Sequence, residues 1–399
     1  EVHGLGELGN HKIHAPMHKT GSAEGDFAIT IPQRPVQTLP LAPRLFSADF
    51  LVPQIAVDVQ INCGDAVLYL TAPVYLDVAP PVSIACPDAP YLIRTTTGQA
   101  RTVRLLLTNN SAEPLAEYLA LTVPNGWTSK PERLPISFAK EGEQRFVSFV
   151  VTAPQNLKPG DYPVYAQIVG AKQQQEILLR VVDVAVPESA RVGVIQSYDD
   201  TFIKTLKKVG VAHETLAISD YIPERLDTFT AIIVDIRAYQ YRPDLVANNS
   251  VLLDYVARGG TLLVMYQKTF DWQEDFAPYP ITLSRNRVTR EDAPVSVLVP
   301  EHPLFTTPNL IAERDWLGWI QERGLYFPSQ WNDAYTPLVM TQDPGEEIPA
   351  GSYLVASHGE GYYVYSALGW YRQLRELHPG SLRCFANMLA LRGKGKRSD

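Results

Sequence analysis

Three short, continuous apolar runs constrain the fold more than any other feature of the sequence. The runs are 192–195, 231–234 and 261–266. Helical patterns lie between them, one ending at Gly210 and the other at Gly259-Gly260. Continuous apolar runs are typical of strands buried on both faces, as in a parallel sheet, and the intervening helices supply the crossovers. We therefore predict an open α/β sheet domain in residues 191–392.

The polar residues that follow these runs mark the edge of the sheet at which a ligand would bind. In open α/β sheets, ligands occupy the crevice beyond the carboxyl ends of the strands. Residues 197–200, 235–239 and 266–269 follow the three runs and form this predicted rim. The candidate ligand-binding residues on it are Asp235, Arg237, Tyr239 and Gln267.

A β-rich region precedes the α/β domain. Residues 82–187 contain strand patterns separated by turns such as Asn109-Asn110 and Pro159-Gly160. Strands and turns at this spacing are typical of an antiparallel β-sandwich of immunoglobulin size. Residues 1–81 are predicted to form an irregular lead-in followed by a β-rich segment. The expected fold class is therefore multi-domain, an Ig-like antiparallel β-sandwich followed by an open α/β sheet.

A long insertion, 268–350, separates the third apolar run from the last strands of the α/β domain. Insertions of this length at the edge of a sheet usually shape a site. Five of its residues are further ligand candidates: Arg287, Glu291, Trp316, Trp319 and Glu322. On a helix, Trp316 and Trp319 would share one face. Two interpretations stay open: the indole rings hold a sugar ring, or they pack the insertion against the sheet.

The remaining pattern of the α/β domain consists of a hairpin and a helix. Residues 353–356 and 362–366 are predicted to pair across the turn at Gly359-Glu360-Gly361, and residues 382–391 to form the last helix. Cys384 falls inside that helix and is predicted to be a packed core thiol.

Several classes of function are disfavoured by what the sequence contains. The formal net charge of −8 gives no support for a nucleic-acid surface, and no apolar run is long enough to span a membrane. The G-x-S-x-G pattern of a nucleophile elbow does not occur, so covalent catalysis is not expected. Neither nucleotide-binding glycine motif occurs either, and no cofactor is predicted.

The histidines and cysteines give no strong metal or disulfide signal. His3, His11, His14 and His18 lie in the irregular lead-in without a nearby cysteine, and no metal site is predicted there. Three cysteines are too few for a disulfide framework. Whether Cys63 and Cys86 pair or remain free thiols stays open, with free thiols favoured.

Motifs in both domains resemble known families. Residues 109–110, 124–127 and 159–162 of the β-rich region are similar to the Ig-like module associated with α-galactosidases. Residues 301–304 and 359–369 resemble the ThuA-like and class I glutamine amidotransferase-like superfamily, which implies a flavodoxin-like topology. That superfamily has a Gly-His pair where this chain has Gly369-Trp370, so its catalytic role does not carry over.

The order of motifs between residues 80 and 390 resembles the C-terminal region of large bacterial PIG-L (LmbE-like) deacetylases, most specifically at 318–328. The deacetylase domain of that family binds zinc through a His-Pro-Asp-Asp motif, which this chain lacks. The resemblance therefore implies an exported accessory region of an N-acetylglucosaminyl deacetylase. Its implied partners are a deacetylase domain, in cis or in trans, and a carbohydrate or glycan.

Three functional hypotheses follow. The leading one is a non-catalytic accessory region that binds glycan or positions the deacetylase domain. The second is a sugar-acting hydrolase at the carboxyl edge of the α/β sheet, which would need two carboxylates roughly 5–9.5 Å apart in one cleft. Its acid and base would be drawn from Asp235, Glu291, Glu313 and Glu322. The third is a purely structural interaction module.

Overall fold

The computed structural model describes residues 2–4, 55–63, 66–74, 80–96 and 100–394. The first of its sheets has the order β1-β2-β3 and is antiparallel. Its strands are β1 (Val2–Gly4), β2 (Ile55–Cys63) and β3 (Ala66–Val74). β2 and β3 lie within the β-rich segment expected toward the end of residues 1–81. His11, His14 and His18 lie outside the described residues, as do the side chains of His3 and Cys63.

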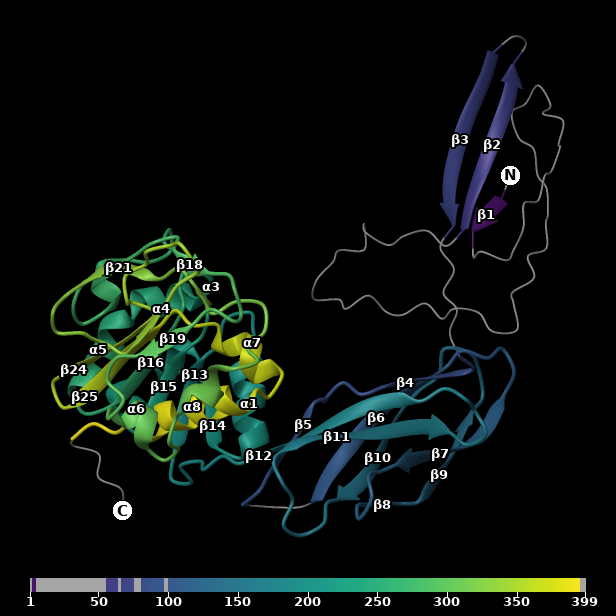
Figure 1. Cartoon of the computed structure of the whole chain (residues 1–399), viewed down its shortest axis with the longest axis horizontal. Coiled ribbons are helices and arrows are strands. Elements are labelled where there is room, and N and C mark those ends of the chain that lie inside the picture. Colours follow the sequence, from purple (N-terminus) through teal and green to yellow (C-terminus); the bar gives the residue numbers. More distant parts are fainter. Residues whose placement is uncertain (1, 5–54, 64–65, 75–79, 97–99, 395–399) are drawn as a thin grey trace.

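Two sheets form the β-sandwich (Figure 1). The four-stranded sheet has the order β4 (Val82–Ala85), β6 (Ala100–Asn109), β10 (Gln144–Thr152), β8 (Thr128–Lys130). The five-stranded sheet has the order β5 (Tyr91–Arg94), β12 (Gln175–Val182), β11 (Gly160–Ile168), β7 (Leu115–Thr122), β9 (Arg133–Phe138). All pairs are antiparallel except β5 with β12. The predicted antiparallel sandwich is thus confirmed in its broad form.

The period-two pattern of the sequence positions the sandwich core. In β6, Val103, Leu105 and Leu107 are fully buried, whereas Arg104 between them is exposed. Successive side chains of a strand point to opposite faces, so one face of β6 packs inward and the other meets solvent. Trp127 is also buried and packs on Tyr162, with 5.2 Å between ring centroids.

The α/β domain is built on a seven-stranded mixed sheet. Its order is β14 (Ala212–Thr215), β13 (Arg191–Ile195), β15 (Ala231–Val234), β16 (Thr261–Met265), β25 (Gly361–Ser366), β24 (Tyr353–His358), β22 (Thr336–Pro337). The first five strands are parallel, and β24 and β22 are antiparallel to their neighbours. The three apolar runs form β13, β15 and β16, so the predicted parallel sheet is confirmed, as is the predicted hairpin, β24–β25.

Helices cover this sheet (Figure 1). The α-helices are α1 (Thr201–Val209), α2 (Pro223–Leu226), α3 (Ala238–Tyr241), α4 (Pro243–Ala247), α5 (Asn249–Ala257), α6 (Pro303–Thr306), α7 (Trp370–Arg375) and α8 (Pro379–Ala390). The 3-10 helices are η2 (Ile218–Asp220), η3 (Glu274–Phe276) and η4 (Glu313–Trp316). The last helix begins three residues before the predicted start, because His378 caps it by accepting a hydrogen bond from the backbone N–H of Ser381.

The insertion 268–350 folds into three short antiparallel ladders. They are β17 (Ile281–Leu283) with β21 (Pro328–Trp331), β18 (Arg287–Val288) with β20 (Gly324–Leu325), and β19 (Val295–Val297) with β23 (Val339–Thr341). The same segment supplies β22, which pairs with β24 at the end of the main sheet. The insertion is therefore continuous with the domain rather than a separate module.

The connection between the sandwich and the α/β domain is held by a buried amide network. The side chain of Asn309 donates to the carbonyl of Ala185 and accepts from its N–H, both at 2.8 Å. Asn387 of α8 in turn accepts from the N–H of Asn309 at 2.9 Å and donates to its carbonyl at 2.8 Å. Leu92 of β5 packs in the α/β core. The two domains are thus joined through hydrogen bonds and apolar contacts as well as through the chain.

Replacing Asn387 by alanine tests this network. The substitution removes four hydrogen bonds and leaves buried backbone groups of Leu304 and Asn309 unpaired. We expect the free energy of unfolding to fall by roughly 2–4 kcal/mol. Urea unfolding followed by tryptophan fluorescence measures it. The control is Asn332→Ala, which removes one hydrogen bond of an exposed turn. If both variants lose the same small amount of unfolding free energy, the amide network does not stabilise the connection between the domains.

Candidate functional site

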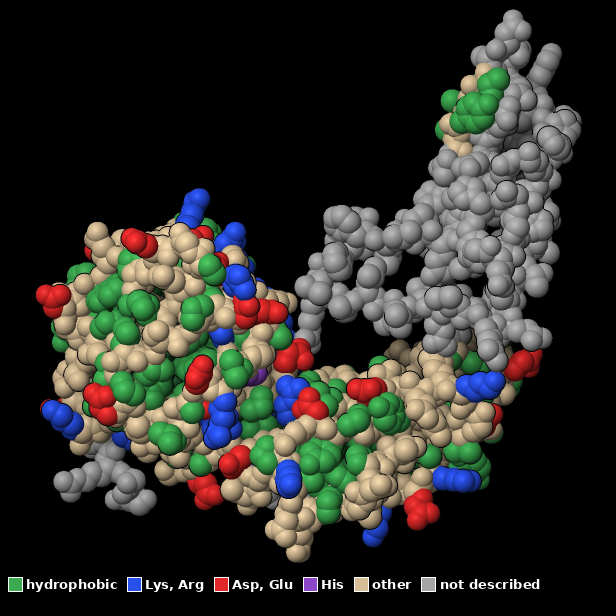
Figure 2. All heavy atoms as spheres, in the orientation of Figure 1, with side chains coloured by type: hydrophobic (Ala, Val, Ile, Leu, Met, Phe, Trp, Pro, Cys, Tyr) green, Lys and Arg blue, Asp and Glu red, His purple; other side chains and the backbone are tan. Residues whose placement is uncertain are grey.

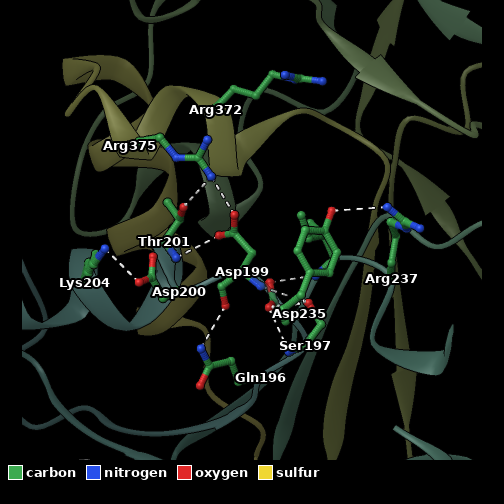
Figure 3. Close-up of polar contacts among 12 residues, drawn as sticks. Gln196, Ser197, Asp199, Asp200, Thr201, Lys204, Asp235, Arg237, Arg372 and Arg375 are labelled. Carbon is green, nitrogen blue, oxygen red and sulfur yellow. Dashed lines mark hydrogen bonds and ion pairs between the residues drawn. The ribbon is translucent and has the colours of Figure 1, made fainter. Parts of the chain in front are cut away.

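The candidate site lies where the strand order of the parallel sheet reverses. From β13 the chain passes to β14 on one side and then to β15 on the other. A crevice outside the carboxyl ends of the strands is expected at this position. Ser197 follows β13 and Asp235 follows β15, and the two side chains meet across this point (Figure 3). The predicted rim is therefore assembled at the sheet edge as the sequence indicated.

Asp235 is a buried carboxyl group with three hydrogen-bond donors. Its Oδ2 accepts from the N–H of Ser197 at 3.0 Å and from the Ser197 hydroxyl at 2.8 Å, and its Oδ1 accepts from the N–H of Ile236 at 2.7 Å. Burial raises the pKa of Asp235 to about 7, the hydrogen bonds from Ser197 oppose the rise, and Asp199 adds to it. The group anchors the ends of two strands and exchanges a proton near neutral pH.

Gln267 and Tyr239 support the rim from beneath rather than facing a ligand. Gln267 is fully buried, donates to the carbonyls of Asp235 and Met265, and accepts from the N–H of Tyr239. Tyr239 is also buried, donates to Asn249 at 2.6 Å and stacks on a phenylalanine ring. Because both side chains are enclosed and satisfied internally, the expectation that they contact a ligand directly is corrected to a positioning role.

Arg237 is the predicted rim residue that does reach the surface. It has φ +54°, a left-handed conformation that costs a non-glycine residue about 1 kcal/mol or more and often marks a functional position. Its guanidinium lies 5.2 Å from the ring centroids of both Tyr198 and Tyr241 and donates to both hydroxyls. The two tyrosines are about half exposed. Tyr198, Arg237 and Tyr241 together form what we call the rim platform.

A second charged contact at this sheet edge joins the end of β13 to α7. Asp199 is buried, accepts from the N–H of Thr201 at 2.8 Å, and pairs with Arg375 of α7 at 2.5 Å (Figure 3). The pair fixes α7 over the start of α1. Arg372 of the same helix pairs instead with Glu322 at 2.7 Å. α7 thus connects the rim to the insertion.

Trp316 and Trp319 do not offer a surface to a sugar ring. Both are about 3% exposed, and their rings pack against each other and against Trp370 with centroids 5.2–6.0 Å apart. Only Trp316 belongs to η4, which ends there, so the expected common helix face does not exist. The interpretation as packing of the insertion against the sheet is the one that the structure supports. Trp370 itself is buried, and its indole N–H donates to the Ser366 hydroxyl.

Two of the remaining candidates, Glu291 and Glu322, lie near each other around Gln321 and Arg372, whereas the others lie elsewhere. Glu291 is exposed and accepts from the N–H of Gln321, while Glu322 is held by Arg372. Glu313 is exposed at the start of η4. No two of the four carboxylates proposed for the hydrolase share a partner among the described contacts. Arg287 is exposed on β18 and lines a hollow of about 320 Å³.

Metal and thiol chemistry find no site in the part of the chain that the structure describes. Within those residues, no group of three or more His, Cys, Asp or Glu side chains could hold a metal ion. Cys384 is buried as predicted, and burial holds the pKa of its thiol well above the usual range. Cys86 is a free thiol, and its Sγ lies 3.7 Å from the Tyr91 hydroxyl. None of the described helices combines the length and the apolar character needed to cross a membrane.

Sequence reasoning did not single out three of the residues that now define the surface of the site. Tyr198 and Tyr241 became candidates because the Arg237 guanidinium lies between their rings. Tyr326 became a candidate because it lines the hollow. The available signal for Tyr198 was its position within residues 197–200. Tyr326 lies within the stretch 318–328, but its place beside the hollow depends on the fold of the insertion and on its left-handed φ of +56°.

Comparison with known proteins places one stretch of the chain in a family. Residues 95–169 match the family described as the NPCBM-associated, NEW3 domain of α-galactosidase. The stretch begins just before β6 and ends just after β11, within the sandwich, and includes Asn109, Trp127 and Tyr162. The predicted resemblance of this region to the α-galactosidase-associated module is thereby confirmed. No curated protein matches the chain.

Solved structures share only distant likeness. A cold-adapted β-galactosidase from Rahnella sp. R3 is 13% identical, with a TM-score of 0.35, over 52% of this chain and 32% of its own. The Escherichia coli α-2-macroglobulin is 16% identical, with a TM-score of 0.23, over 34% of this chain and 9% of its own. The chain thus spans about a third of the β-galactosidase. These TM-scores are too low to define the fold of the whole chain.

Asp235→Asn tests the protonation of the buried carboxyl. In the unfolded chain the group loses its proton near pH 3.8, and in the folded protein near pH 7, so the folded state binds more protons between these values. Stability contributed by this group is therefore present below pH 4 and lost as the pH rises to about 7. We expect the stability of the wild type relative to Asp235→Asn to fall over that window by up to roughly 4 kcal/mol.

Urea unfolding of both proteins at pH 4.5, 6, 7 and 8 measures this difference, with Asp200→Asn as the control. Asp200 forms an exposed pair with Lys204 on the same segment. Curves for the wild type and Asp235→Asn that stay parallel across the whole pH series would show that the carboxyl does not change its protonation on folding.

Proposed function

We propose that this chain is a non-catalytic accessory region of a carbohydrate-active enzyme, a PIG-L-type N-acetylglucosaminyl deacetylase, and that it binds glycan. The observation that carries the proposal is the match of residues 95–169 to the NEW3 domain, an accessory domain of glycoside hydrolases. The occurrence of such domains in extracellular enzymes supports an exported protein.

Two features of the α/β domain support the ThuA-like assignment and an absence of catalysis. The five parallel strands, numbered along the chain, stand in the order 2-1-3-4-5, which is that of flavodoxin-like folds. Buried Trp370 occupies the position at which the superfamily has histidine, and His302 serves to cap α6 by accepting from the N–H of Leu304. Both side chains thus have structural roles in this chain.

The rim platform supports glycan binding. Tyr198 and Tyr241 expose about half of their surface at the sheet edge where ligands of α/β domains bind. Aromatic rings suit the apolar C–H face of a sugar, and the hydroxyls and the Arg237 guanidinium provide partners for its edge. Hydrogen bonds from Arg237 to Gln240 and both tyrosines hold the platform in place.

The double variant Tyr198→Ala/Tyr241→Ala tests the platform. Calorimetric titration of the chain with N-acetylglucosamine oligomers and with other neutral and acidic oligosaccharides identifies the glycan. We expect the double variant to bind it about tenfold more weakly or worse, a loss of at least about 1.4 kcal/mol. Tyr118→Ala is the matched control, because Tyr118 is equally exposed but lies on β7 of the sandwich.

The outcome that would overturn glycan binding is a folded wild-type chain that binds no saccharide in the panel. Unchanged affinity in the double variant would instead move the binding site away from the rim platform.

The proposed association with a deacetylase domain is tested by DNA sequencing of the gene and its neighbours. Reading the coding sequence upstream of the codon for Glu1 should show an in-frame domain with the His-Pro-Asp-Asp zinc motif, or such a domain in a neighbouring gene. A different catalytic domain at that place would replace the deacetylase in the proposal and leave the accessory role intact.

A further inference from the structure

Two arginines without partners line the hollow beside the rim. The hollow of about 320 Å³ is bounded by Arg285, Arg287, Leu325 and Tyr326. Neither guanidinium has a hydrogen bond or an ion pair with a described residue. Their neighbours differ: Arg290 pairs with Asp292 at 2.6 Å, and Arg372 pairs with Glu322 at 2.7 Å. The two guanidiniums of the hollow are thus left without a carboxylate partner among the described residues.

The backbone that carries these arginines is fixed. Arg287 of β18 stands opposite Leu325 of β20, and the N–H of Phe327 donates to the carbonyl of Asn286 at 3.0 Å. Val288 is buried and Asn286 is half-buried, whereas Arg285 and Arg287 are exposed. Arg285 lies at a bend just before β18, and Arg287 lies in the ladder itself. Both arginines line the same hollow.

Tyr326 forms the aromatic wall of the hollow. It is half-buried and holds a left-handed backbone conformation with φ +56°. Its ring stacks on buried Tyr266, with centroids 6.1 Å apart and planes within 6°, and Tyr266 packs in turn on Tyr371 of α7. Tyr266 directly follows β16, so the stack joins the hollow to the rim of the sheet.

Charge on the surface agrees with this arrangement. Figure 2 shows Lys and Arg side chains gathered at the edge of the α/β domain near β18 and α3. The chain as a whole has a formal net charge of −8. A local pair of arginines on a protein of negative net charge suits one anionic group on a ligand better than a long polyanion such as nucleic acid.

We propose that this hollow binds the acidic group of a charged sugar residue, with Arg285 and Arg287 on its oxygens and Tyr326 beside the ring. The inference rests on the proposed glycan-binding function and adds the class of glycan, an acidic one. Guanidinium groups match the planar geometry of a carboxylate and also bind sulfate and phosphate oxygens. A hexuronic acid combines such a carboxylate with a ring of the size that a tyrosine side chain covers.

Calorimetric titration with oligogalacturonate, a sulfated oligosaccharide, neutral N-acetylglucosamine oligomers and inorganic phosphate tests the site. We expect oligogalacturonate to bind most tightly. The double variant Arg285→Gln/Arg287→Gln should weaken that binding by about tenfold or more and leave the binding of neutral oligomers unchanged. The variant Arg285→Lys/Arg287→Lys keeps the charge but loses the planar guanidinium groups. Its affinity for oligogalacturonate should lie between those of the wild type and the double glutamine variant.

Arg290→Gln is the matched control, because it removes a positive charge three residues from Arg287 at an exposed position. The affinity of Arg290→Gln for oligogalacturonate is compared with that of the single variants Arg285→Gln and Arg287→Gln. An equal loss of affinity in Arg290→Gln and in either single variant would reveal a general charge effect and overturn the site. All variants change exposed side chains, and an unaltered urea midpoint confirms that each is folded.

The ligand panel separates this inference from the proposed function. Binding of neutral oligomers without preference for an acidic sugar overturns the inference and leaves the accessory role standing. Tighter binding of inorganic phosphate than of any saccharide, lost in the double variant, would make the hollow a site for a free anion and overturn its assignment to sugar. If the folded wild type binds no saccharide at all, the proposed function fails together with the inference.

Discussion

The burial of the parallel strands on both faces is the constraint on which the α/β domain depends. Val194, Ile233 and Leu263 are almost completely buried, and the residues around them within these strands are apolar. Polar side chains begin where the strands end, and the first of them are still buried in the domain. Asp235 therefore accepts a hydrogen bond from Ser197 at the end of β13, and Gln267 donates one to the carbonyl of Asp235 at the end of β15. Arg237, two residues farther along the chain than Asp235, lies beside the exposed Tyr198 and Tyr241.

The insertion relies on a second, aromatic constraint. Trp316, Trp319 and Trp370 pack into one buried cluster between the insertion and α7. Buried aromatic pairs contribute packing free energy beyond the area that they bury. Asp315, next to Trp316, is fully enclosed and pairs with Arg383 of α8. The insertion is thus attached at its centre, and its β18–β20 ladder carries the exposed Arg287.

The parts of the fold that could be predicted are those in which a local pattern decides the structure. Apolar runs gave β13, β15 and β16, but β14 was missed, because an edge strand such as Ala212–Thr215 is half-polar and has no periodic signal. The rim was located by the ends of the runs, but which of its side chains point outward depends on contacts such as that of Gln267 with Tyr239. The hollow depends on the pairing of Arg287 with Leu325, which no local pattern encodes.

The buried amide network at Ala185 has a mechanical consequence. A connection between domains usually allows one to swing against the other, but here the Asn309 side chain holds both the N–H and the carbonyl of Ala185. The sandwich and the α/β domain are therefore held in a fixed relative orientation rather than joined by a flexible linker. A polymer held at the sheet edge would keep a constant distance and direction from whatever is attached to the sandwich.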